Sequence, residues 1–538
     1  MTRLLQEWLT RQAERSPNAT AVVMGQERLT YGQLEILSNQ IAHALRAAGC
    51  GRGDRVCLLL PKSPTTVASM LGILKADACY VPLDTASPAP RIAKIVDSAQ
   101  PHVLLASTRG AATVQALLDR GEARGSFRIG WMDRGSSAGR PFGPVFTLDD
   151  VQRLPVATPS YGNASGDCAH ILFTSGSTGT PKGVMITHAG VIRFVEWATD
   201  YFGLSATDRL SGHSPFHFDL STFDLFGTFA VGAELHLVPP ELNVLPHKFP
   251  GFIREAGLTQ WFSVPSVLTL MAQLDVVRHD DLPTLRRLLW CGEVFPTRAL
   301  RYWMSRLPHV TFTNLYGPTE ATIASSYYSV ERCPDDDRAP IPIGRPCAGE
   351  DLLVLDETLH PVPVGEIGDL YIRGVGLSPG YWREPDKTDA AFLRNPFGTD
   401  PDDRIYRTGD LAKVGPDGLV YFVGRADTQI KSRGYRIELG EIEAALLTLR
   451  DIREAAVVAL PTDGFEGTAI GCAYVARSAA AVTPLALRRE LAKLLPAYML
   501  PSRWQAHERL PRNTNGKIDR RRIREEWTPD EAPALGPS

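Results

Sequence analysis

Short apolar runs alternate with amphipathic segments through the N-terminal half of the chain. Arg55–Leu60 and Cys79–Leu83 are apolar enough for buried strands, and Thr65–Lys75 between them has its apolar residues at helical spacing. Similar strands, each followed by a segment of helical pattern, are predicted at Ala169–Phe173, Glu234–Val238, Gln260–Val264 and Leu285–Trp290. This alternation favours sheets that are covered by helices on both faces. Between Ser107 and Asp167 the chain is rich in Gly, Ser and Arg, which predicts an irregular connection.

The pattern changes near residue 424. Before it, a β-rich subdomain is predicted with strands at Asp351–Leu355, Gly368–Arg373 and Leu419–Val423. After it, the order helix, strand, strand, helix predicts an α+β unit of about 100 residues, enough for a core of its own. Those elements are Gly440–Leu449, Ala455–Leu460, Ala469–Ala476 and Pro484–Leu495. We therefore predict an α/β protein with a large core domain over 1–424, a hinge at 425–427, a small mobile domain over 428–522 and a disordered tail over 523–538.

Composition narrows the function classes without naming one. The chain has 538 residues, 44% of them hydrophobic, and a net charge of −3, so no overall basic field attracts nucleic acid or an anionic membrane. No apolar run reaches the length of a membrane span, and the N-terminus lacks the pattern of a signal peptide. The eight cysteines are scattered without a CxxC pair, which favours reduced, mostly buried thiols in a cytoplasmic protein.

The most informative segment is ILFTSGSTGTPKG, residues 171–183, where an apolar strand enters a loop with three glycines, five hydroxyl residues and one lysine. Backbone N–H groups, hydroxyls and an ammonium are the groups that bind a polyphosphate. The loop lacks the Gly-Lys-Ser/Thr of a P-loop kinase or ATPase, and its serines do not fit a nucleophile elbow. A Ser/Gly-rich surface loop is the alternative.

This loop resembles the signature of the adenylate-forming superfamily, which includes acyl- and aryl-CoA ligases, luciferases and the adenylation domains of nonribosomal peptide synthetases. Further segments match the adenylation domains in the same order: LTY (29–31), LKADACYVPLD (74–84), FDLS (218–221), NLYGPTE (314–320), GEIGDL (365–370), YRTGD (406–410), GRADTQIK (424–431), LPAYM (495–499) and NGKID (515–519). The resemblance covers residues 5 to 522 and departs at Asp77, where the family usually has glycine.

The resemblance implies ATP and Mg²⁺ as cofactors. Attack of a carboxylate on the α-phosphate of ATP brings anions together, so the site must neutralise charge while it holds the reacting groups in line. By resemblance, Lys517 bridges the carboxylate and the α-phosphate, Glu320 binds Mg²⁺, and Lys431 belongs to the segment used for thioester formation. The residues expected to hold the β- and γ-phosphates are Thr174, Ser175, Gly176, Ser177, Thr178, Gly179 and Lys182.

The resemblance also assigns the nucleoside contacts. Asp410 is expected to accept both ribose hydroxyls, because a carboxylate offers several acceptor sites, and Arg425 to support it. The NLYGPTE segment supplies Asn314 at the adenine amino group, Tyr316 stacked on the ring, Gly317 beside it and Thr319 at the α-phosphate. Asp427 is expected to be the residue about which the small domain swings.

Asp219 selects among the family's substrates. It opens an apolar segment, and a carboxylate in such surroundings is costly unless it is paired. In the amino-acid-activating branch of the family, the residue at this position binds the substrate's α-ammonium, and the resemblance implies the same role for Asp219. The alternative is that Asp219 only caps the helix that follows it. The side-chain pocket is expected to consist of Asp219, Leu220, Phe223, Ser263, Leu289, Cys291, Leu315, Ile323 and Ala324. With no second formal charge, this set favours a small neutral amino acid (Gly, Ala, Ser, Thr or Cys), and valine, 2-aminobutyrate and proline stay open.

The chain contains no carrier-domain serine motif and ends 21 residues after Lys517 (538 − 517). We therefore expect a freestanding adenylation enzyme that loads a free amino acid onto the phosphopantetheine thiol of a separate carrier protein. Some relatives also need an MbtH-like protein, and the sequence does not decide this point. The rival functions are an acyl- or aryl-CoA ligase and a non-catalytic nucleotide-binding module, and the presence of Lys517, Glu320 and Asp410 disfavours the second.

Overall fold

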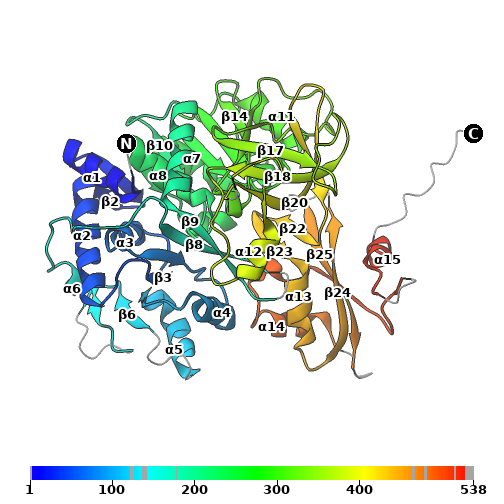
Figure 1. Ribbon diagram of the computed structural model, residues 1–538, viewed down its shortest axis with the longest axis horizontal. Coiled ribbons are helices and arrows are strands. Elements are labelled where there is room, and N and C mark those ends of the chain that lie inside the picture. The colour runs from blue at the N-terminus through cyan, green and yellow to red at the C-terminus, as the bar shows by residue number, and fades with distance from the viewer. Residues whose placement is uncertain are drawn as a thin grey trace, which may run out of the picture. The chain divides into compact units, whose positions relative to one another are not determined.

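The computed structural model divides into two compact units (Figure 1). The first comprises Met1–Thr85, Ile92–Thr174 and Lys182–Asp427, and the second comprises Ala86–Arg91, Ser175–Pro181 and Thr428–Ser538. The structure describes residues 3–120, 127–135, 142–176, 179–400, 402–462, 467–477, 482–513 and 517–527.

A seven-stranded sheet contains the predicted strand–helix–strand segment. Its order is β7-β6-β5-β3-β4-β8-β9, and β8 and β9 form its antiparallel pair. The strands are β3 (Arg55–Leu59), β4 (Cys79–Pro82), β5 (Val103–Ala106), β6 (Arg128–Trp131), β7 (Phe146–Thr147), β8 (Cys168–Thr174) and β9 (Lys182–Thr187). Helices α2 (Tyr31–Ala47) and α3 (Pro64–Lys75) pack on one face, and α4 (Ala89–Ala99) and α5 (Ala111–Asp119) pack on the other. The prediction of a sheet with helices on both faces is confirmed.

Two local predictions in this sheet are wrong. The stretch 107–167 is not wholly irregular, because β6, β7, α5 and α6 (Leu148–Val151) lie within its described part. The strand at 168–174 is followed by β9 and not by a helix, since the glycine-containing loop lets the chain reverse into a hairpin.

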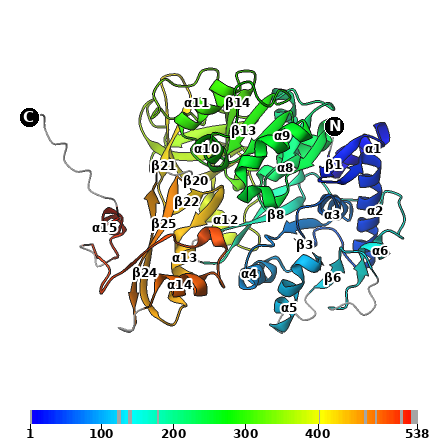
Figure 2. The ribbon, with the colours of Figure 1, turned by 180° about the vertical axis from the view of Figure 1, so that it is seen from behind.

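A nine-stranded sheet forms the second layer of the first unit, in the order β16-β15-β14-β13-β12-β10-β11-β1-β2. The strands are β1 (Thr20–Met24), β2 (Glu27–Thr30), β10 (Arg209–Gly212), β11 (Glu234–Leu237), β12 (Gln260–Ser263), β13 (Arg287–Cys291), β14 (Thr311–Tyr316), β15 (Ser326–Ser329) and β16 (Arg345–Pro346). Strands β10 to β14 are parallel, so their carboxyl ends meet at one edge. Helices α7 (His188–Tyr201) and α8 (Leu220–Val231) pack on one face. The other face carries α9 (Phe249–Ala256), α10 (Pro265–Gln273) and α11 (Thr297–Arg306) (Figure 2).

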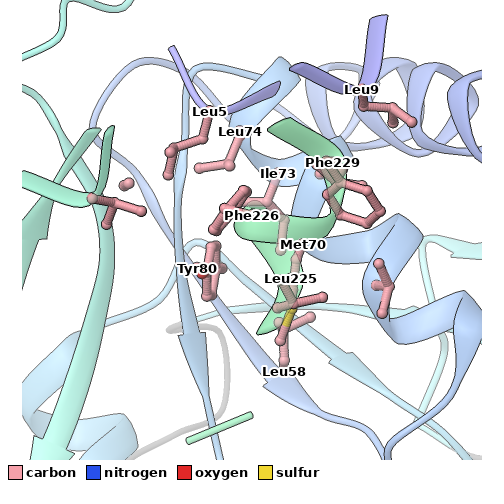
Figure 3. Packing of buried hydrophobic residues seen from close by; sticks show 14 of the residues in the cluster. Leu5, Leu9, Leu58, Met70, Ile73, Leu74, Tyr80, Leu225, Phe226 and Phe229 are labelled. Atoms are coloured by element: carbon pink, nitrogen blue, oxygen red, sulfur yellow. The ribbon is translucent and has the colours of Figure 1, made fainter. Parts of the chain in front are cut away.

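The core between the two sheets is built from helices α1 (Gln6–Arg15), α3 and α8 (Figure 3). Phe226 and Phe229 of α8 pack beside Met70 and Leu74 of α3, and Leu9 of α1 lies against the same cluster. All of these side chains are at most 1% exposed. This packing holds α8, whose first turn carries the predicted substrate residues Leu220 and Phe223, against the rest of the unit.

The predicted β-rich subdomain is confirmed as an antiparallel sheet of β17 (Glu350–Leu355), β18 (Gly368–Gly374), β20 (Arg404–Val414), β19 (Phe392–Arg394) and β21 (Val420–Arg425). The first unit ends at Asp427, two residues after the last of these strands. Among the described residues no helix is long and apolar enough to cross a membrane. Six of the eight cysteines are buried and none is in a disulfide, as the sequence predicts.

The second unit has the predicted α+β order. The hairpin of β22 (Gln429–Ser432) and β23 (Tyr435–Glu438) precedes α13 (Leu439–Leu447), the sheet of β24 (Ile452–Pro461), β25 (Thr468–Ala476) and β26 (Arg503–Ala506), and helices α14 (Pro484–Leu491) and α15 (Arg520–Glu525). The tail predicted from residue 523 begins too early. Asp519 caps α15 by accepting a hydrogen bond from the Arg522 N–H, and Ile523 is fully buried. The rest of the predicted tail, 528–538, lies outside the described residues.

Candidate active site

The predicted substrate and nucleotide residues of the first unit converge on the carboxyl edge of the nine-stranded sheet. Strands β12, β13 and β14 lie side by side and end at Ser263, Cys291 and Tyr316. In parallel α/β sheets the carboxyl ends of the strands are the usual place for a ligand, because the loops that follow them provide the contacts. The segment 317–324 leaves β14 at this edge, and Asp219 precedes α8.

Asp219 does not cap the helix that it precedes. Its side chain makes no capping hydrogen bond to α8. Instead its Oδ2 atom accepts a hydrogen bond from Thr319 Oγ1 at 2.7 Å, and the residue is 9% exposed. The helix-cap alternative is therefore excluded, and the predicted ammonium ligand lies in direct contact with the residue predicted to touch the α-phosphate.

An apolar wall lies beside Asp219. One cluster contains seven of the predicted pocket residues, namely Leu220, Phe223, Leu289, Cys291, Leu315, Ile323 and Ala324, each at most 5% exposed. Phe223 is fully buried, and its ring lies 5.5 Å from Phe194, 6.2 Å from Phe202 and 6.0 Å from Phe262, centre to centre. Phe223 is thus packed among three other aromatic rings.

Phe262 was missed by the sequence analysis, although strand alternation contains the signal. In the register of the sheet, Phe262 pairs with Leu289, and Ser263 pairs with Trp290 of the opposite face. Ser263 can therefore reach the pocket only from the carboxyl end of β12. Its hydroxyl is buried and has no hydrogen-bond partner within the part of the chain that the structure describes.

The predicted ribose ligand is held from two sides. Tyr316 donates its hydroxyl proton to Asp410 Oδ2, and Arg425 donates to Asp410 Oδ1 at 2.7 Å. Burial and the neighbouring Asp410 carboxylate raise the pKa of Tyr316 well above its usual value, so the tyrosine remains a donor. These contacts fix the buried Asp410 carboxylate in one orientation beside Tyr316, the last residue of β14. A ligand's hydroxyl groups can donate hydrogen bonds to this carboxylate.

Asn314 and Gly317 have packing roles that the sequence analysis did not anticipate. The Asn314 amide donates to the Pro342 carbonyl at 2.8 Å, which leaves its Oδ1 atom as the acceptor for an amino group. A Cβ atom on Gly317 would come within 2.5 Å of Ala324 Cα, so only glycine permits the chain to pass at this point. Gly317 therefore allows the close approach of the two ends of segment 317–324, and Asn314 is fixed by Pro342.

Glu320 is fully buried, and two side chains from neighbouring segments hold its carboxylate. Lys182 Nζ lies 3.2 Å from its Oε1 atom, and Tyr381 donates a hydrogen bond to the same atom at 2.8 Å. The Lys182 ammonium also donates to the Tyr381 hydroxyl at 3.1 Å. No spacing in the sequence pointed to Tyr381, because its contact depends on how the β-rich subdomain packs on β9.

The predicted phosphate loop joins β8 to β9. Thr174 and Lys182 pair across the end of this hairpin, and Thr174 Oγ1 is buried without a hydrogen-bond partner among the described residues. Ser175 and Gly176 are buried, and Gly179 has a positive φ of 80°, which glycine adopts readily. Ser177 and Thr178 lie outside the described residues.

Besides the phosphate-loop residues within Ser175–Pro181, three more predicted residues lie at the unit boundary or in the second unit. Asp427 is the last residue of the first unit, and its Oδ1 atom accepts a hydrogen bond from Arg425 Nε at 2.9 Å. Lys431 lies on β22 and pairs with Arg436 of β23. The Lys517 N–H donates to Asn513 Oδ1 at 3.0 Å, and Asn515 and Gly516 lie outside the described residues. Within the described part of the chain, no group of three or more His, Cys, Asp or Glu side chains could hold a metal ion.

Two family models match this chain. The model of the AMP-binding enzyme family matches residues 9–382, and that of the AMP-binding enzyme C-terminal domain matches residues 441–517. The chain is 36% identical over 532 residues to an L-proline--[L-prolyl-carrier protein] ligase of Streptomyces coelicolor, with 96% of each chain covered. It is 35% identical to bacitracin synthase 1 of Bacillus licheniformis over 97% of its own length, but it spans only 9% of that synthase.

A solved structure shows the same fold. The adenylation domain AlmE of Vibrio cholerae, in complex with glycyl-adenosine-5'-phosphate, superimposes with a TM-score of 0.84 at 24% identity and covers 98% of both chains. The two family models, together with a ligase matched over 96% of both chains, show that the chain belongs to the AMP-binding enzyme family.

Proposed function

We propose that the protein activates an amino acid with ATP and transfers it to the phosphopantetheine thiol of a carrier protein. The single observation that carries this proposal is Asp219: a buried carboxylate that caps no helix, contacts Thr319 and borders an apolar pocket. A carboxylate so placed suits the α-ammonium of an amino acid, whereas a fatty or aromatic acid has no ammonium to pair with it. The carrier-protein ligase relative supports the same acceptor.

The proposed reaction has two steps. In the first, the amino acid's carboxylate attacks the α-phosphate of ATP, the bond to the β-phosphate breaks, and pyrophosphate leaves. In the second, the carrier's thiol loses its proton and attacks the aminoacyl carbonyl, and AMP leaves. Lys517 neutralises the reacting anions in the first step, and the segment at Lys431 serves the second. Asp410, held by Tyr316 and Arg425, orients the nucleotide.

Glu320 is the residue that would hold Mg²⁺. Its carboxylate oxygens are the ligand type that Mg²⁺ prefers, and the ion would neutralise the leaving polyphosphate. Lys182 and Tyr381 hold this carboxylate in place. Thr174, with a buried hydroxyl that lacks a partner among the described residues, would donate to a phosphate oxygen.

For the amino acid itself, we propose a small neutral side chain: Gly, Ala, Ser, Thr or Cys. Phe223 and its aromatic neighbours fill the space beside Asp219, and the Ser263 hydroxyl offers one polar contact at the edge. The S. coelicolor relative is named for proline, which keeps proline as the alternative. A carrier protein is the proposed partner, an MbtH-like protein is an optional one, and we place the reaction in the cytoplasm, where ATP is available.

The test is amino-acid-dependent exchange of pyrophosphate into ATP. The assay compares the proteinogenic amino acids, 2-aminobutyrate, benzoate and a short fatty acid, with and without an MbtH-like protein. Asp219→Ala should abolish exchange with the amino acid, and Ser221→Ala, two residues along the same segment, is the matched control. Exchange with benzoate or the fatty acid alone would favour a CoA ligase and contradict the role of Asp219.

A further inference from the structure

Glu350, the first residue of β17, buries its carboxyl group within the first unit. The residue is 9% exposed, and its Oε1 atom accepts a hydrogen bond from the Gly376 N–H at 2.7 Å. Its Oε2 atom is buried and has no hydrogen-bond partner among the described residues. Burial raises the pKa of Glu350 to about 8. A buried carboxyl oxygen without a hydrogen-bond partner is unfavourable. The hydrogen bond from the Gly376 N–H to the other oxygen is therefore the contact that holds this carboxyl group in place.

That contact continues toward the proposed amino-acid pocket. Gly376 donates its N–H to Glu350. The carbonyl oxygen of the same glycine accepts a hydrogen bond from Thr322 Oγ1 at 2.6 Å. Both hydrogen bonds are buried, so they are exchanged with water far less readily than surface contacts. Glu350, Gly376 and Thr322 therefore form one connected series that ends at the pocket wall.

The end of this series is strained. Thr322 and Ile323 have φ angles of 53° and 74°, the left-handed region that β-branched residues avoid. Such conformations persist only when the surrounding structure holds them, and they cluster at functional sites. Ile323 and Ala324 are the pocket residues that follow directly. The hydroxyl of Thr322 ties this turn to Gly376, which follows β18 of the β-rich subdomain.

Two glycines, one at the end of β18 and one in the loop after it, pack closely against the Glu350 carboxyl group. A Cβ atom on Gly376 would lie 2.9 Å from both Ala321 O and Glu350 Oε1. Gly374 has a φ of 149°, and a Cβ atom there would lie 2.6 Å from Glu350 Oε2. Contacts under 3.0 Å force something to shift, so the backbone is closely fitted around the Glu350 carboxyl group.

We propose that Glu350 is a positioning residue for the amino-acid pocket: acting through Gly376 and Thr322, it holds the strained turn that places Ile323 and Ala324. Glu350 is not among the predicted substrate or nucleotide residues, and we expect it to set the affinity and selectivity for the amino acid rather than the affinity for ATP. This inference rests on the proposed amino-acid activation.

The test measures KM for the amino acid, KM for ATP and kcat by pyrophosphate exchange in full-length variants. Glu350→Ala should raise the amino-acid KM by about 10- to 100-fold, the effect of a misplacement near 1 Å, with the ATP KM unchanged within about twofold. Glu350→Gln keeps an acceptor oxygen for the Gly376 N–H and should restore most of the affinity. Thr322→Val should resemble Glu350→Ala, and the double variant should be no worse than either. Glu357→Ala, an exposed residue of the turn after β17, is the control.

The outcomes separate this inference from the proposed function. If the wild type exchanges with no amino acid, the proposed function and this inference both fail. If it does exchange, an unchanged amino-acid KM in Glu350→Ala, an equal rise in both KM values, or additive effects of the two substitutions would overturn the positioning role alone. Thr322→Val, which keeps the side-chain volume, decides the matter if Glu350→Ala does not fold.

Discussion

Removing the hydroxyl of Tyr316 should weaken ATP binding and leave the amino acid unaffected. In the structure this hydroxyl donates to Asp410 Oδ2, while Arg425 donates to Oδ1 at 2.7 Å. A hydrogen bond to a charged group contributes about 1.5–3 kcal/mol, and each 1.4 kcal/mol is a factor of about ten in affinity. Because Arg425 continues to hold the other oxygen, Tyr316→Phe should raise the ATP KM by about tenfold, at the lower end of that range.

The assay is pyrophosphate exchange at saturating amino acid with varied ATP, repeated with 2'-deoxy-ATP. If Asp410 binds the ribose, the wild type should discriminate against the deoxynucleotide, and Tyr316→Phe should discriminate less. Tyr201→Phe is the control, because it removes a tyrosine hydroxyl that bonds to Ser329 at 2.9 Å on the surface of the same unit. An unchanged ATP KM in Tyr316→Phe would refute the argument that this hydroxyl orients the ribose ligand.

Three further predictions test the proposed catalytic lysine, the proposed pocket wall and the buried carboxyl group of Glu350. Lys517→Ala should abolish adenylate formation in the exchange assay but leave binding of a fluorescent ATP analogue within about threefold, since a single exposed cation contributes little to ground-state affinity; undiminished exchange would refute its role. Phe223→Ala should lower the free energy of unfolding by about 3–5 kcal/mol, measured by urea denaturation, because the ring is fully buried among aromatic neighbours; a loss below about 1 kcal/mol would contradict that packing. Burial raises the pKa of Glu350 from 4.5 to about 8, so the folded state binds this proton more tightly than the unfolded state does. The wild type should therefore lose stability as the pH rises between these two values, by up to about 1.4 kcal/mol per pH unit. Glu350→Gln should lack this loss, and parallel stability–pH curves for the two proteins would contradict it.

The strand–helix–strand segment at 55–83 could be predicted because its signals are local. An apolar run, a helical spacing and a second apolar run occur within thirty residues, and β3, α3 and β4 match them within one residue at each end. By contrast β9 was missed, because its pairing with β8 depends on a reversal in a loop that the sequence marked only as a phosphate site.

In the candidate site, too, local sequence signals were predictive and long-range contacts were not. Residue types and motif order led to the prediction of Asp219, Asp410 and Glu320 as site residues, but they did not predict the neighbours that hold these carboxylates in the structure. Tyr381 lies 61 residues from Glu320, and no periodicity links residues at that separation. The contact exists only after two sheets have packed together, so a tertiary contact of this kind lies beyond pattern arguments.

The contacts of Arg425 bear on two of our proposals, that the chain pivots at Asp427 and that Asp410 binds the ribose. Its guanidinium pairs with Asp410, whose side chain is 6% exposed, and with Asp427, whose side chain is 46% exposed. An exposed ion pair contributes at most about 1 kcal/mol, whereas the buried pair is screened much less. We therefore expect the Asp427 contact to break first if the chain pivots at this boundary, while Asp410 stays bound to Arg425 and Tyr316. Asp427→Ala should then leave the ATP KM unchanged within about twofold and alter only the thioester step, and a large rise in the ATP KM would show that the two carboxylates act as one unit.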